Sequence, residues 1–355
     1  MADLFGNIYK DKKVLVTGDT GFKGSWLCIW LKELGAHVYG YALPPLTSDD
    51  NFVTAGLKNQ IHHTDGDIRN KEVLQKYFNE VQPDITFHLA AQPLVIESYQ
   101  NPHYNFETNI MGTVNFFEAV RNCPSVKVAI NVTTDKCYQN NEWEWGYREN
   151  EAMGGNDPYS ASKGCSELVT HAYLKSFFSK QNTAAIASAR AGNVIGGGDW
   201  AENRIIPDII RAFKNNTAAI IRNPDSVRPW QFVLEPLSGY LQLASKLYTD
   251  GKKYSGGWNF GPSAYENYMV SDVISEIKKI IPGIQIDIQS DVVKHHEAGL
   301  LKLDITKAVN QLQWKPRLNL SQNIEFAIEG YMQEIQNPKD LYQNRVSQIK
   351  KYIKS

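Results

Sequence analysis

A tyrosine and a lysine four positions apart, in Pro158-Tyr159-Ser160-Ala161-Ser162-Lys163, form the pair most suggestive of chemistry in this sequence. At the start of a helix, this spacing places Tyr159 and Lys163 on one face, one turn apart. An ammonium group nearby stabilises a phenolate, so we expect a pKa for Tyr159 below its reference of about 10. Such a tyrosine can take or give a proton at a sugar hydroxyl while a hydride passes to a nicotinamide. The pair alone is common by chance, so the other motifs of the sequence must indicate whether it is catalytic.

A second polar group, Thr133-Thr134-Asp135-Lys136, follows directly on an apolar run expected to form a strand over 126–132. In doubly wound sheets ligands bind at the carboxyl ends of the strands, so these hydroxyl, acid and amine groups would line the cleft. The alternative is a helix cap made by Thr-Thr-Asp, followed by an exposed lysine. The segment by itself leaves both interpretations open.

Three glycines, Gly18, Gly21 and Gly24, lie between an expected strand and an apolar helix in VLVTGDTGFKGSWLCIW. The first makes the tight turn, the second lets the backbone reach a pyrophosphate, and the third lets the helix pack close to the strand. The pyrophosphate would then lie on the free N–H groups of the helix start. This strand–turn–helix near the N-terminus predicts dinucleotide binding and strengthens the case for Tyr159 and Lys163.

The remaining cofactor signals follow the next strands. The second strand, 36–41, ends in Gly40-Tyr41-Ala42-Leu43, without the acid that usually holds the adenosine ribose or an arginine that would select NADP. Asp67 follows a short strand over 61–64 and is a candidate acceptor for the adenine amino group. After a strand over 85–89, Ala90 and Ala91 are small enough for a backbone to approach the cofactor closely.

Composition narrows the functional classes. The 355-residue chain has a net charge of −1, which gives no indication of a nucleic-acid or anionic-membrane partner. The four cysteines show no paired or metal-type spacing, as expected for reduced thiols in the cytoplasm. The paired histidines, at 62–63 and 295–296, lack a third ligand, so no metal site is expected. No signal peptide precedes Lys13, and no apolar run approaches ~18 residues.

The order of the motifs predicts an α/β fold: a Rossmann-type doubly wound parallel sheet with a smaller C-terminal substrate-binding domain. We expect residues 1–190, with a returning segment at 231–262, to form the dinucleotide-binding domain. Residues 191–230 and 263–355 would then bind the substrate. Arg222 and Arg228 lie close to Trp230 in this second part, a combination suited to gripping phosphates and stacking on a base.

These motifs together resemble the extended short-chain dehydrogenase/reductase family, and within it the nucleotide-sugar 4,6-dehydratases, closest to the branch that acts on CDP-glucose. The similarity covers nearly the whole chain. It is carried by TGDTGFKGSWL, LAAQPLV, TTDKCYQNNEWEWGYRENEAMGG, DPYSASKGCSELV, RAGNVIGGGDWAENRIIPDI, IRNPDSVRPWQFVLEPLSGYL, WNFGP and HEAGLLKLD.

The resemblance implies a redox-neutral reaction with NAD retained in the site. Tyr159 would deprotonate the glucose 4-hydroxyl, Lys163 would steady the phenolate and hold the nicotinamide ribose, and Thr134 would hydrogen-bond the same hydroxyl. Asp135 would protonate the departing 6-hydroxyl, which requires a pKa well above its reference of about 3.9. The wider family has Asp-Glu after the threonine, whereas this chain has Asp135-Lys136, so a neutral Lys136 would be the C5 base.

The resemblance also implies the remaining site residues and the assembly. The expected dinucleotide contacts are Gly18, Thr20, Gly21, Phe22, Lys23, Gly24, Asp67, Ile68, Leu89, Ala90, Ala91, Tyr159 and Lys163. The expected substrate contacts are Gln92, Asn193, Arg204, Arg222, Arg228 and His296. A homodimer would form through helices near 104–121 and 160–178, and the apolar residues Phe116, Phe117 and Val120 would serve either this seam or the core.

One departure from the branch lies in the glycine loop, where Asp19 stands in place of a typical histidine. A carboxylate near a pyrophosphate should repel it and weaken cofactor affinity, unless Lys23 offsets the charge. Two other functions stay open at this stage. One is a dehydratase or epimerase for a dTDP-, UDP- or GDP-linked sugar, and the other is a non-catalytic protein that binds nucleotide sugars.

Overall fold

The computed structural model describes residues 4–263, 266, 268–289 and 300–355. Its centre is a seven-stranded sheet in the order β11-β6-β5-β4-β1-β2-β3, in which every neighbouring pair is parallel. The strands are β1 (Lys13–Thr17), β2 (His37–Ala42), β3 (His62–Asp65), β4 (Ile85–His88), β5 (Val128–Val132), β6 (Ala185–Ala191) and β11 (Gly256–Phe260). The predicted doubly wound α/β fold is therefore confirmed.

The strand order reverses between β1 and β4. From β1 the chain adds β2 and β3 on one side, then crosses over to add β4, β5, β6 and β11 on the other. At such a switch point the loops leave neighbouring strands in opposite directions, which opens a crevice at the carboxyl ends of the strands. The glycine loop follows β1, Ala90 follows β4 and Thr134 follows β5, so all three motifs end at this edge.

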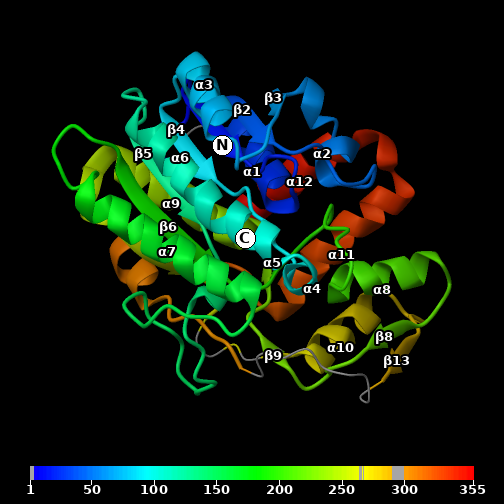
Figure 1. Ribbon diagram of the computed structural model, residues 1–355. Coiled ribbons are helices and arrows are strands. Elements are labelled where there is room, and N and C mark those ends of the chain that lie inside the picture. Colours follow the sequence, from blue (N-terminus) through cyan, green and yellow to red (C-terminus); the bar gives the residue numbers. More distant parts are fainter. Residues whose placement is uncertain (1–3, 264–265, 267, 290–299) are drawn as a thin grey trace.

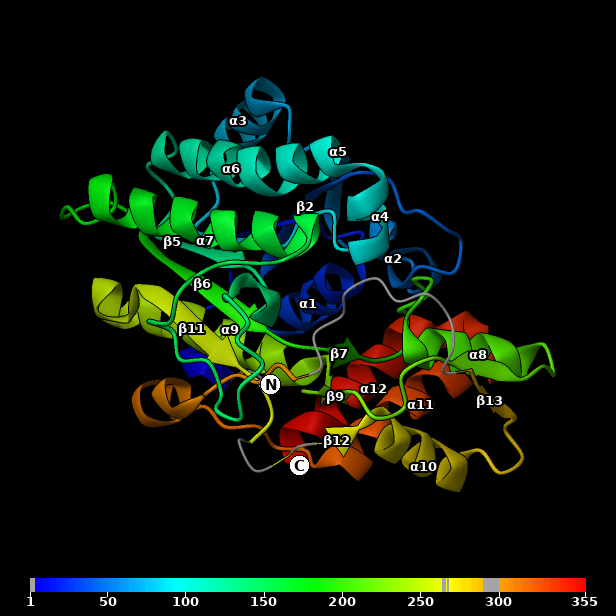
Figure 2. The same cartoon turned by 60° about the horizontal axis from the view of Figure 1, so that its bottom comes forward.

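Helices cover both faces of the sheet, which explains why the central strands β1, β4 and β5 are almost continuously apolar. One layer holds α3 (Lys71–Val81), α6 (Gly112–Arg121) and α7 (Pro158–Ser176). The other holds α1 (Phe22–Glu33), α9 (Leu234–Asp250) and α12 (Leu341–Lys354). Figures 1 and 2 show α6 and α7 side by side on one face of the sheet, with α1 and α9 on the opposite face.

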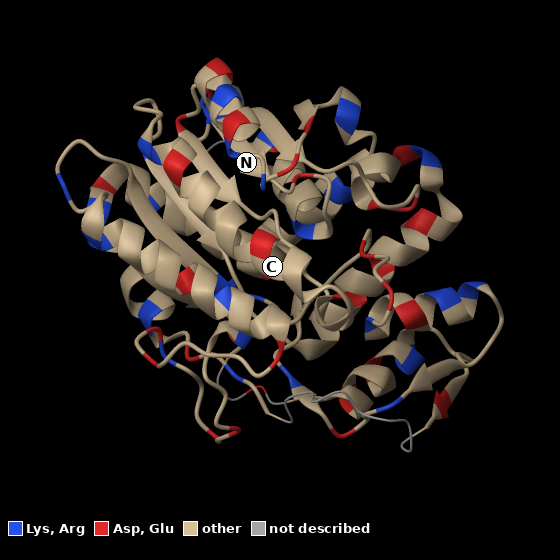
Figure 3. Ribbon diagram, in the orientation of Figure 1, with Lys and Arg blue, Asp and Glu red and all other residues tan. Residues whose placement is uncertain are grey.

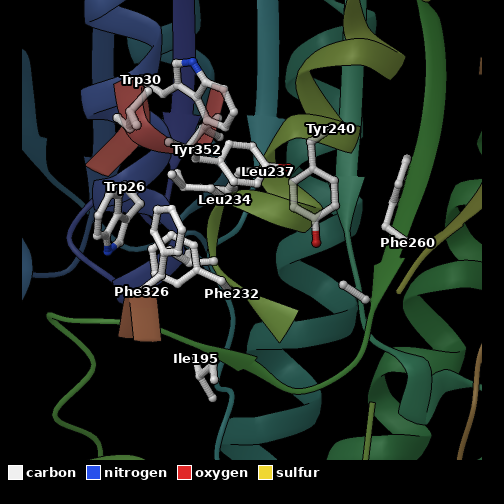
Figure 4. Packing of buried hydrophobic residues seen from close by; sticks show 14 of the residues in the cluster. Trp26, Trp30, Ile195, Phe232, Leu234, Leu237, Tyr240, Phe260, Phe326 and Tyr352 are labelled. Atoms are coloured by element: carbon white, nitrogen blue, oxygen red, sulfur yellow. The ribbon is translucent and has the colours of Figure 1, made fainter. Parts of the chain in front are cut away.

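Helix α1 is buried on nearly all sides, and its sequence is apolar accordingly. It lies between the sheet and α12, so that both Trp26 and Trp30 are at most 1% exposed. The Trp26 ring packs edge-on against Phe232 and the Trp30 ring against Tyr352, each with 5.9 Å between ring centroids. Figure 4 shows these rings converging from α1, the segment before α9, and the C-terminal helices. The last helix of the chain thus fixes the helix that begins at the glycine loop.

A smaller group of elements lies beyond the carboxyl edge of the sheet (Figure 2). It contains α8 (Ile205–Lys214), α10 (Val270–Ile280) and α11 (Leu320–Gln336). Three two-stranded pairs connect them: β7 (Val194–Ile195) with β10 (Gln231–Phe232), β8 (Ala219–Ile221) with β13 (Ile286–Ile288), and β9 (Val227–Arg228) with β12 (Tyr268–Met269). The connections between the larger elements also contain three short helices: α2 (Asn51–Thr54), α4 (Val95–Gln100) and α5 (Pro102–Phe106). The proposed division into two domains stays a prediction.

The helix expected over 104–121 is divided into α5, a π-helical turn η3 (Glu107–Met111), and α6. Phe116, Phe117 and Val120 are at most 2% exposed and pack beneath the sheet-facing side of α6. Their apolar character is therefore explained by the core rather than by a seam between subunits.

Charged residues lie mainly on peripheral helices and loops with both signs intermixed, while the central strands are largely free of them (Figure 3). Within the described residues, no helix is long and apolar enough to cross a membrane. No group of three or more His, Cys, Asp or Glu side chains among them could hold a metal ion.

The glycine loop leaves no room for a side chain at Gly24. An added Cβ would lie 2.0 Å from the Gly18 carbonyl oxygen, and this neighbour is backbone that cannot rotate away. We expect Gly24→Ala to lower the free energy of unfolding by about 1–3 kcal/mol, as overpacking commonly does. Urea denaturation would measure it.

Gly261→Ala is the matched control, because its added Cβ would meet no atom closer than 3.7 Å. Equal stability of the Gly24→Ala and Gly261→Ala proteins would contradict the close packing described for the loop.

Candidate active site

The carboxyl end of β5 and the first turns of α7 bring the predicted catalytic residues together. Beyond β5, Thr134 caps the short helix η4 (Asp135–Cys137): its hydroxyl accepts from the Lys136 N–H at 3.3 Å and donates to Asp135 Oδ1 at 2.9 Å. Helix α7 begins after Asp157, whose carboxylate accepts from the Ser160 N–H at 2.9 Å. The threonine-acid segment is therefore both a helix cap and part of the cleft, so the two interpretations of it are compatible.

Tyr159, in the first turn of α7, is 9% exposed. Burial raises its pKa to about 12, with Asp135 adding to the rise, while a hydrogen bond with Thr134 and the charge of Arg204 lower it. The expected lowering of the Tyr159 pKa by Lys163 is thus wrong for the protein without ligands. Removal of the phenol from water outweighs the neighbouring cations.

Lys163 is 7% exposed, and its amine donates to the Val132 carbonyl at 3.4 Å. Burial lowers its pKa to about 8, against the opposing effect of Glu167 one turn further along α7. The amine therefore carries its proton at neutral pH but holds it weakly. It is positioned at the end of β5, beneath the same cleft as Tyr159.

Asp135 is 3% exposed, and its pKa is raised because burial outweighs Lys136, Thr134 and Arg228. A Cβ added at Gly192 would lie 3.0 Å from Asp135 Oδ2, so the carboxyl group adjoins the segment that follows β6. The direction of the shift is the one that a general acid requires. Lys136, by comparison, is only partly buried.

Two further cations face the same centre. Burial, together with the charges of Lys163 and Arg204, lowers the pKa of Lys23, at the start of α1, to about 8, against the opposing effect of Asp135. Arg204 donates to Asp199 Oδ2 at 2.7 Å, and its charge also acts on Tyr159. The sequence indicated Lys23 as a cofactor contact and as a charge that could offset Asp19; in the structure its charge is also coupled to that of Lys163.

A buried ion pair beneath Lys163 was not anticipated from the sequence. Arg190 of β6 donates to Glu167 Oε2 at 2.7 Å, and the hydroxyl of Ser188 donates to the same oxygen at 2.6 Å. The other carboxylate oxygen accepts from Thr133, the neighbour of Thr134. Burial alone would raise the pKa of Glu167, but Arg190 and the hydroxyls lower it overall. Glu167 therefore connects α7, β6 and the end of β5. Its position four residues after Lys163, one helical turn away, is the feature of the sequence that could have identified it.

The π-helical turn η3 has a similar positioning role. Its Asn109 donates to the Gln92 carbonyl at 3.0 Å and to Ser162 Oγ at 2.9 Å, and accepts from the Gln92 N–H at 2.8 Å. Nearby, Asn105 donates to the Pro158 carbonyl at 2.8 Å. These bonds join the loop after β4 to the first turns of α7. The Gln92 side-chain oxygen is buried and has no partner among the described residues.

The glycine loop forms a cradle suited to a dinucleotide. Gly18 has a φ of +78°, and an added Cβ would lie 2.6 Å from the Ala90 nitrogen, so the loop packs directly on the turn after β4. The Leu89 N–H donates to the Thr17 carbonyl at 2.9 Å, and Ala91 follows in that turn. No side chain caps the start of α1 after Gly21, which leaves its N–H groups free for a phosphate.

The other expected cofactor contacts surround this cradle. Thr20 donates its hydroxyl to the Leu43 carbonyl at 2.9 Å, and Phe22 begins α1. Asp67 pairs with Arg69, with 2.6 Å between Oδ2 and Nη2, which lowers the pKa of the carboxyl group. Ile68 is 5% exposed and packs against Gly112, where an added Cβ would lie 2.8 Å from the Ile68 side chain.

The predicted substrate residues are more dispersed. Arg228 lines a small pocket with Pro262, Lys302 and Leu303, which joins β9 to the end of β11. Arg222, in contrast, is exposed beyond β8. Asn193 follows β6, and its carbonyl accepts from the Gln231 N–H at 3.1 Å. The prediction for His296 lies outside the described residues.

Fold and site define an extended α/β protein of the short-chain dehydrogenase/reductase class, with a glycine-loop cradle beside a buried Tyr-Lys pair. A family model described as GDP-mannose 4,6 dehydratase matches residues 15–326. The chain is 51% identical, over 323 residues and 90% of both chains, to the CDP-glucose 4,6-dehydratase of Salmonella typhimurium. The chain therefore belongs to this family of NAD-dependent nucleotide-sugar epimerases and dehydratases, and the resemblance seen in its motifs is confirmed.

Solved structures agree on the fold. A UDP-glucose-4-epimerase from Stenotrophomonas maltophila aligns with a TM-score of 0.80 and 19% identity, over 92% of this chain and 99% of that one. A dTDP-glucose 4,6-dehydratase from Bacillus anthracis, in complex with NAD, aligns with a TM-score of 0.75 and 20% identity, over 93% and 99%. At these identities the comparison shows the shared architecture alone.

Burial of Lys163 predicts a characteristic pH dependence of stability. Its pKa in the folded protein, about 8, lies below its ordinary value of 10.5, so between these values the unfolded state binds more protons. The contribution of Lys163 to stability therefore rises with pH across this window. Lys163→Met should be more stable than the wild type near pH 7, by at most about 3 kcal/mol, and the difference should shrink as the pH approaches 10.

Urea denaturation at pH 7, 8, 9 and 9.5 would test this expectation. Lys175→Met, at an exposed lysine in the last turn of the same helix, is the control and should show no such trend. A difference for Lys163→Met that does not vary with pH would contradict the desolvation of its amine.

Proposed function

We propose that this protein is a CDP-glucose 4,6-dehydratase that converts CDP-glucose to CDP-4-keto-6-deoxyglucose with bound NAD. The observation that carries the proposal is the convergence of Tyr159, Thr134, Asp135 and Lys163 at one edge of the sheet, beside the glycine cradle. The similarity to the Salmonella enzyme over 90% of the chain supports the choice of nucleotide. A protein that only bound the nucleotide sugar would have no use for this quartet.

The cradle fits the cofactor. Gly18, Gly21 and Gly24 keep side chains away from the start of α1, where free N–H groups can bind the pyrophosphate. Lys163 would hold the nicotinamide ribose, and Asp67 the adenine. NAD, when bound, would supply the acceptor, and later the donor, of one hydride.

In the first step Tyr159 takes the proton of the glucose 4-hydroxyl. Its pKa of about 12 must fall for this, and the hydrogen bond with Thr134 and the charge of Arg204 act in that direction. Thr134 hydrogen-bonds the same hydroxyl and keeps it directed at the phenol oxygen. Loss of the C4 hydride, for which bound NAD would be the acceptor, gives a 4-ketone that makes the C5 proton acidic.

In the second step a base removes the C5 proton while an acid protonates the departing 6-hydroxyl. Asp135 is the acid, because burial keeps its carboxyl group protonated to higher pH than an ordinary aspartate. Lys136 is the base. Water leaves. A hydride returned to C6 and the proton returned to C5 by Lys136 would give the 4-keto-6-deoxy sugar, with the cofactor back in its starting state.

The segments beyond the carboxyl edge of the sheet complete the site in this proposal. Asn193, Arg204, Arg222 and Arg228 bind the nucleotide sugar, and Gln92 contributes its unpartnered oxygen. Residues 191–230 and 263–355 form the substrate-binding domain. A cytoplasmic location agrees with four cysteines that remain free thiols.

A direct assay tests both the reaction and the nucleotide. The purified protein is incubated with CDP-glucose and, separately, with dTDP-glucose, UDP-glucose and GDP-mannose, with and without added NAD. We expect loss of one water, measured by mass, from CDP-glucose. Dehydration of another donor would overturn the nucleotide assignment, and no product from any donor at saturating NAD would overturn the dehydratase.

Tyr159→Phe isolates the proton transfer. The phenylalanine keeps the ring and its packing but lacks the phenol oxygen, so kcat should fall at least a hundredfold while the Kd for CDP-glucose changes little. Turnover and equilibrium binding are measured on the same preparation. Full turnover by this variant would contradict the role of Tyr159.

We further propose a homodimer that forms through α6 and α7. These helices lie side by side on one face of the molecule (Figures 1 and 2). Large apolar side chains are exposed there: Met111 at 49%, Leu168 at 59% and Phe177 at 41%. Burial of such side chains between two copies removes apolar surface from water.

Leu168→Glu places a charge in the middle of this surface and should give a monomer in analytical ultracentrifugation. Ile220→Glu is the control, because Ile220 is 52% exposed on β8, in the other part of the molecule. A Leu168→Glu protein that sediments as the wild type does would contradict this seam.

A further inference from the structure

A carboxylate that takes no part in the proposed reaction lies one helical turn from Lys163. Glu167 follows Lys163 by four residues on α7, so the two side chains share one face of the helix. Glu167 is 4% exposed and Lys163 is 7% exposed. Burial of a carboxylate is costly unless the group is paired and hydrogen-bonded, so the contacts of Glu167 indicate what its burial serves.

Both oxygens of the Glu167 carboxylate are held by strands of the sheet. Oε2 accepts from Arg190 Nη2 at 2.7 Å and from Ser188 Oγ at 2.6 Å, both on β6. Oε1 accepts from the hydroxyl of Thr133, directly after β5. Burial raises the pKa of Glu167, but these three donors together hold it below its ordinary value. A negative charge is therefore fixed one turn from Lys163 at neutral pH.

The same contacts hold the hydrogen-bond acceptor of Lys163. The Lys163 amine donates to the Val132 carbonyl at 3.4 Å, and Val132 directly precedes Thr133. Glu167 thus grips the end of β5 one residue away from this carbonyl, and it does so from the helix that carries Lys163. A change at Glu167 would therefore reach Lys163 through the position of its acceptor and through the loss of charge.

Three ionisable groups close to Lys163 cannot balance its charge. Burial raises the pKa of Tyr159, on the same helix, to about 12, and it raises the pKa of Cys137, on η4, well above its ordinary range. Burial, together with the charge of Lys163, lowers the pKa of His88 on β4 to about 3. All three groups are therefore neutral at pH 7.

The charged side chains at this edge of the sheet are Lys23, Asp135, Lys136, Glu167, Arg190 and Arg204. Lys23 opposes the charge of Lys163, and Arg190 is already paired with Glu167. Burial lowers the pKa of Lys163 to about 8, and Glu167 is the one carboxylate, among the described residues, that counteracts this effect. Without Glu167 the amine would lose its proton closer to neutral pH.

We propose that Glu167 is a positioning residue for the reaction, which keeps Lys163 in its charged form and fixed against the end of β5. The inference rests on the proposed function, in which the ammonium group of Lys163 steadies the phenolate of Tyr159. It gives the buried ion pair of Glu167 and Arg190 a task. Arg190 and the hydroxyls keep the carboxylate ionised, and the carboxylate in turn keeps the proton on Lys163.

Urea denaturation of the full-length protein measures the charge state of Lys163 without reference to catalysis. Stability is compared with and without Lys163→Met between pH 5.5 and 9.5, in the wild type and in Glu167→Gln. The folded pKa of Lys163 lies below the unfolded one, so the difference grows as the pH falls and becomes constant below the folded pKa. The pH at which it becomes constant is called the break pH.

We expect a break pH near 8 in the wild type and a value lower by about one unit in Glu167→Gln, because the glutamine keeps the shape of the side chain but removes its charge. Thr133→Val and Ser188→Ala are the matched controls. Each removes one hydrogen bond to Glu167 and keeps its charge, so the break pH should stay near 8.

Glu167→Gln leaves Arg190 buried without a charged partner and may therefore fail to fold. A protein with both Glu167→Met and Arg190→Met provides the second measurement. It removes the whole ion pair, and its break pH should also fall, because Glu167 is the member of the pair whose charge acts on Lys163.

The pH profile of turnover with CDP-glucose and NAD connects this charge to the reaction. The alkaline limb of kcat should move down by about one pH unit in Glu167→Gln, which is a tenfold loss of turnover on that side, and should not move in Thr133→Val. An alkaline limb that stays in place while the break pH falls would overturn the positioning role.

The outcomes separate the two proposals. An unchanged break pH in Glu167→Gln, or in the variant that lacks the whole ion pair, would overturn the inference while leaving the dehydratase in place. A wild type that dehydrates no nucleotide sugar would overturn the proposed function, whereas the break pH would still report whether Glu167 keeps Lys163 charged.

Discussion

The chemistry of this protein depends on the removal of ionisable side chains from water at the reversal of strand order. Burial is the largest influence on the pKa of Tyr159, Lys163 and Asp135, and in each case it favours the neutral form. A phenol and a carboxyl group with raised pKa values, and an ammonium group with a lowered one, are groups whose protonation changes readily when a charged ligand enters. The fold creates this condition by closing the carboxyl edge of the sheet with the segments after β6 and β11.

Burial of charged groups is costly unless they are paired, and the buried charges next to the catalytic residues are paired. Glu167 and Arg190 form an ion pair that is almost fully buried and satisfied by hydroxyls from β5 and β6. Their burial suits positioning better than stability, since a buried ion pair adds little to stability by itself. Asn109 of the π-helical turn likewise positions the loop after β4, through its hydrogen bonds with Gln92 and Ser162. Two polar networks thus hold α7 against the sheet on either side of Tyr159.

The core reaches the glycine loop through α1. Trp26 and Trp30 extend from this helix into rings contributed by Phe232 and Tyr352, residues more than 200 positions away in the chain (Figure 4). A helix fixed in this way cannot move away from β1, which keeps Gly24 against the Gly18 carbonyl and the free N–H groups of the helix start in place. The precision of the cofactor cradle is therefore a property of the whole chain.

The sequence by itself determined the class of fold and most strand positions, and it predicted the four residues proposed for catalysis. These follow from local rules: glycine spacing, apolar periodicity, and two side chains one helical turn apart. Only the tertiary structure decided the protonation of Tyr159, since its pKa depends on burial by segments distant in sequence. The same holds for Asp19: its number in the chain placed it beside a phosphate, but the register of β1 with β2 and β3 placed its carboxylate against Gly40 and His63. Which atoms a charge faces is set by contacts between strands, and no local pattern records them.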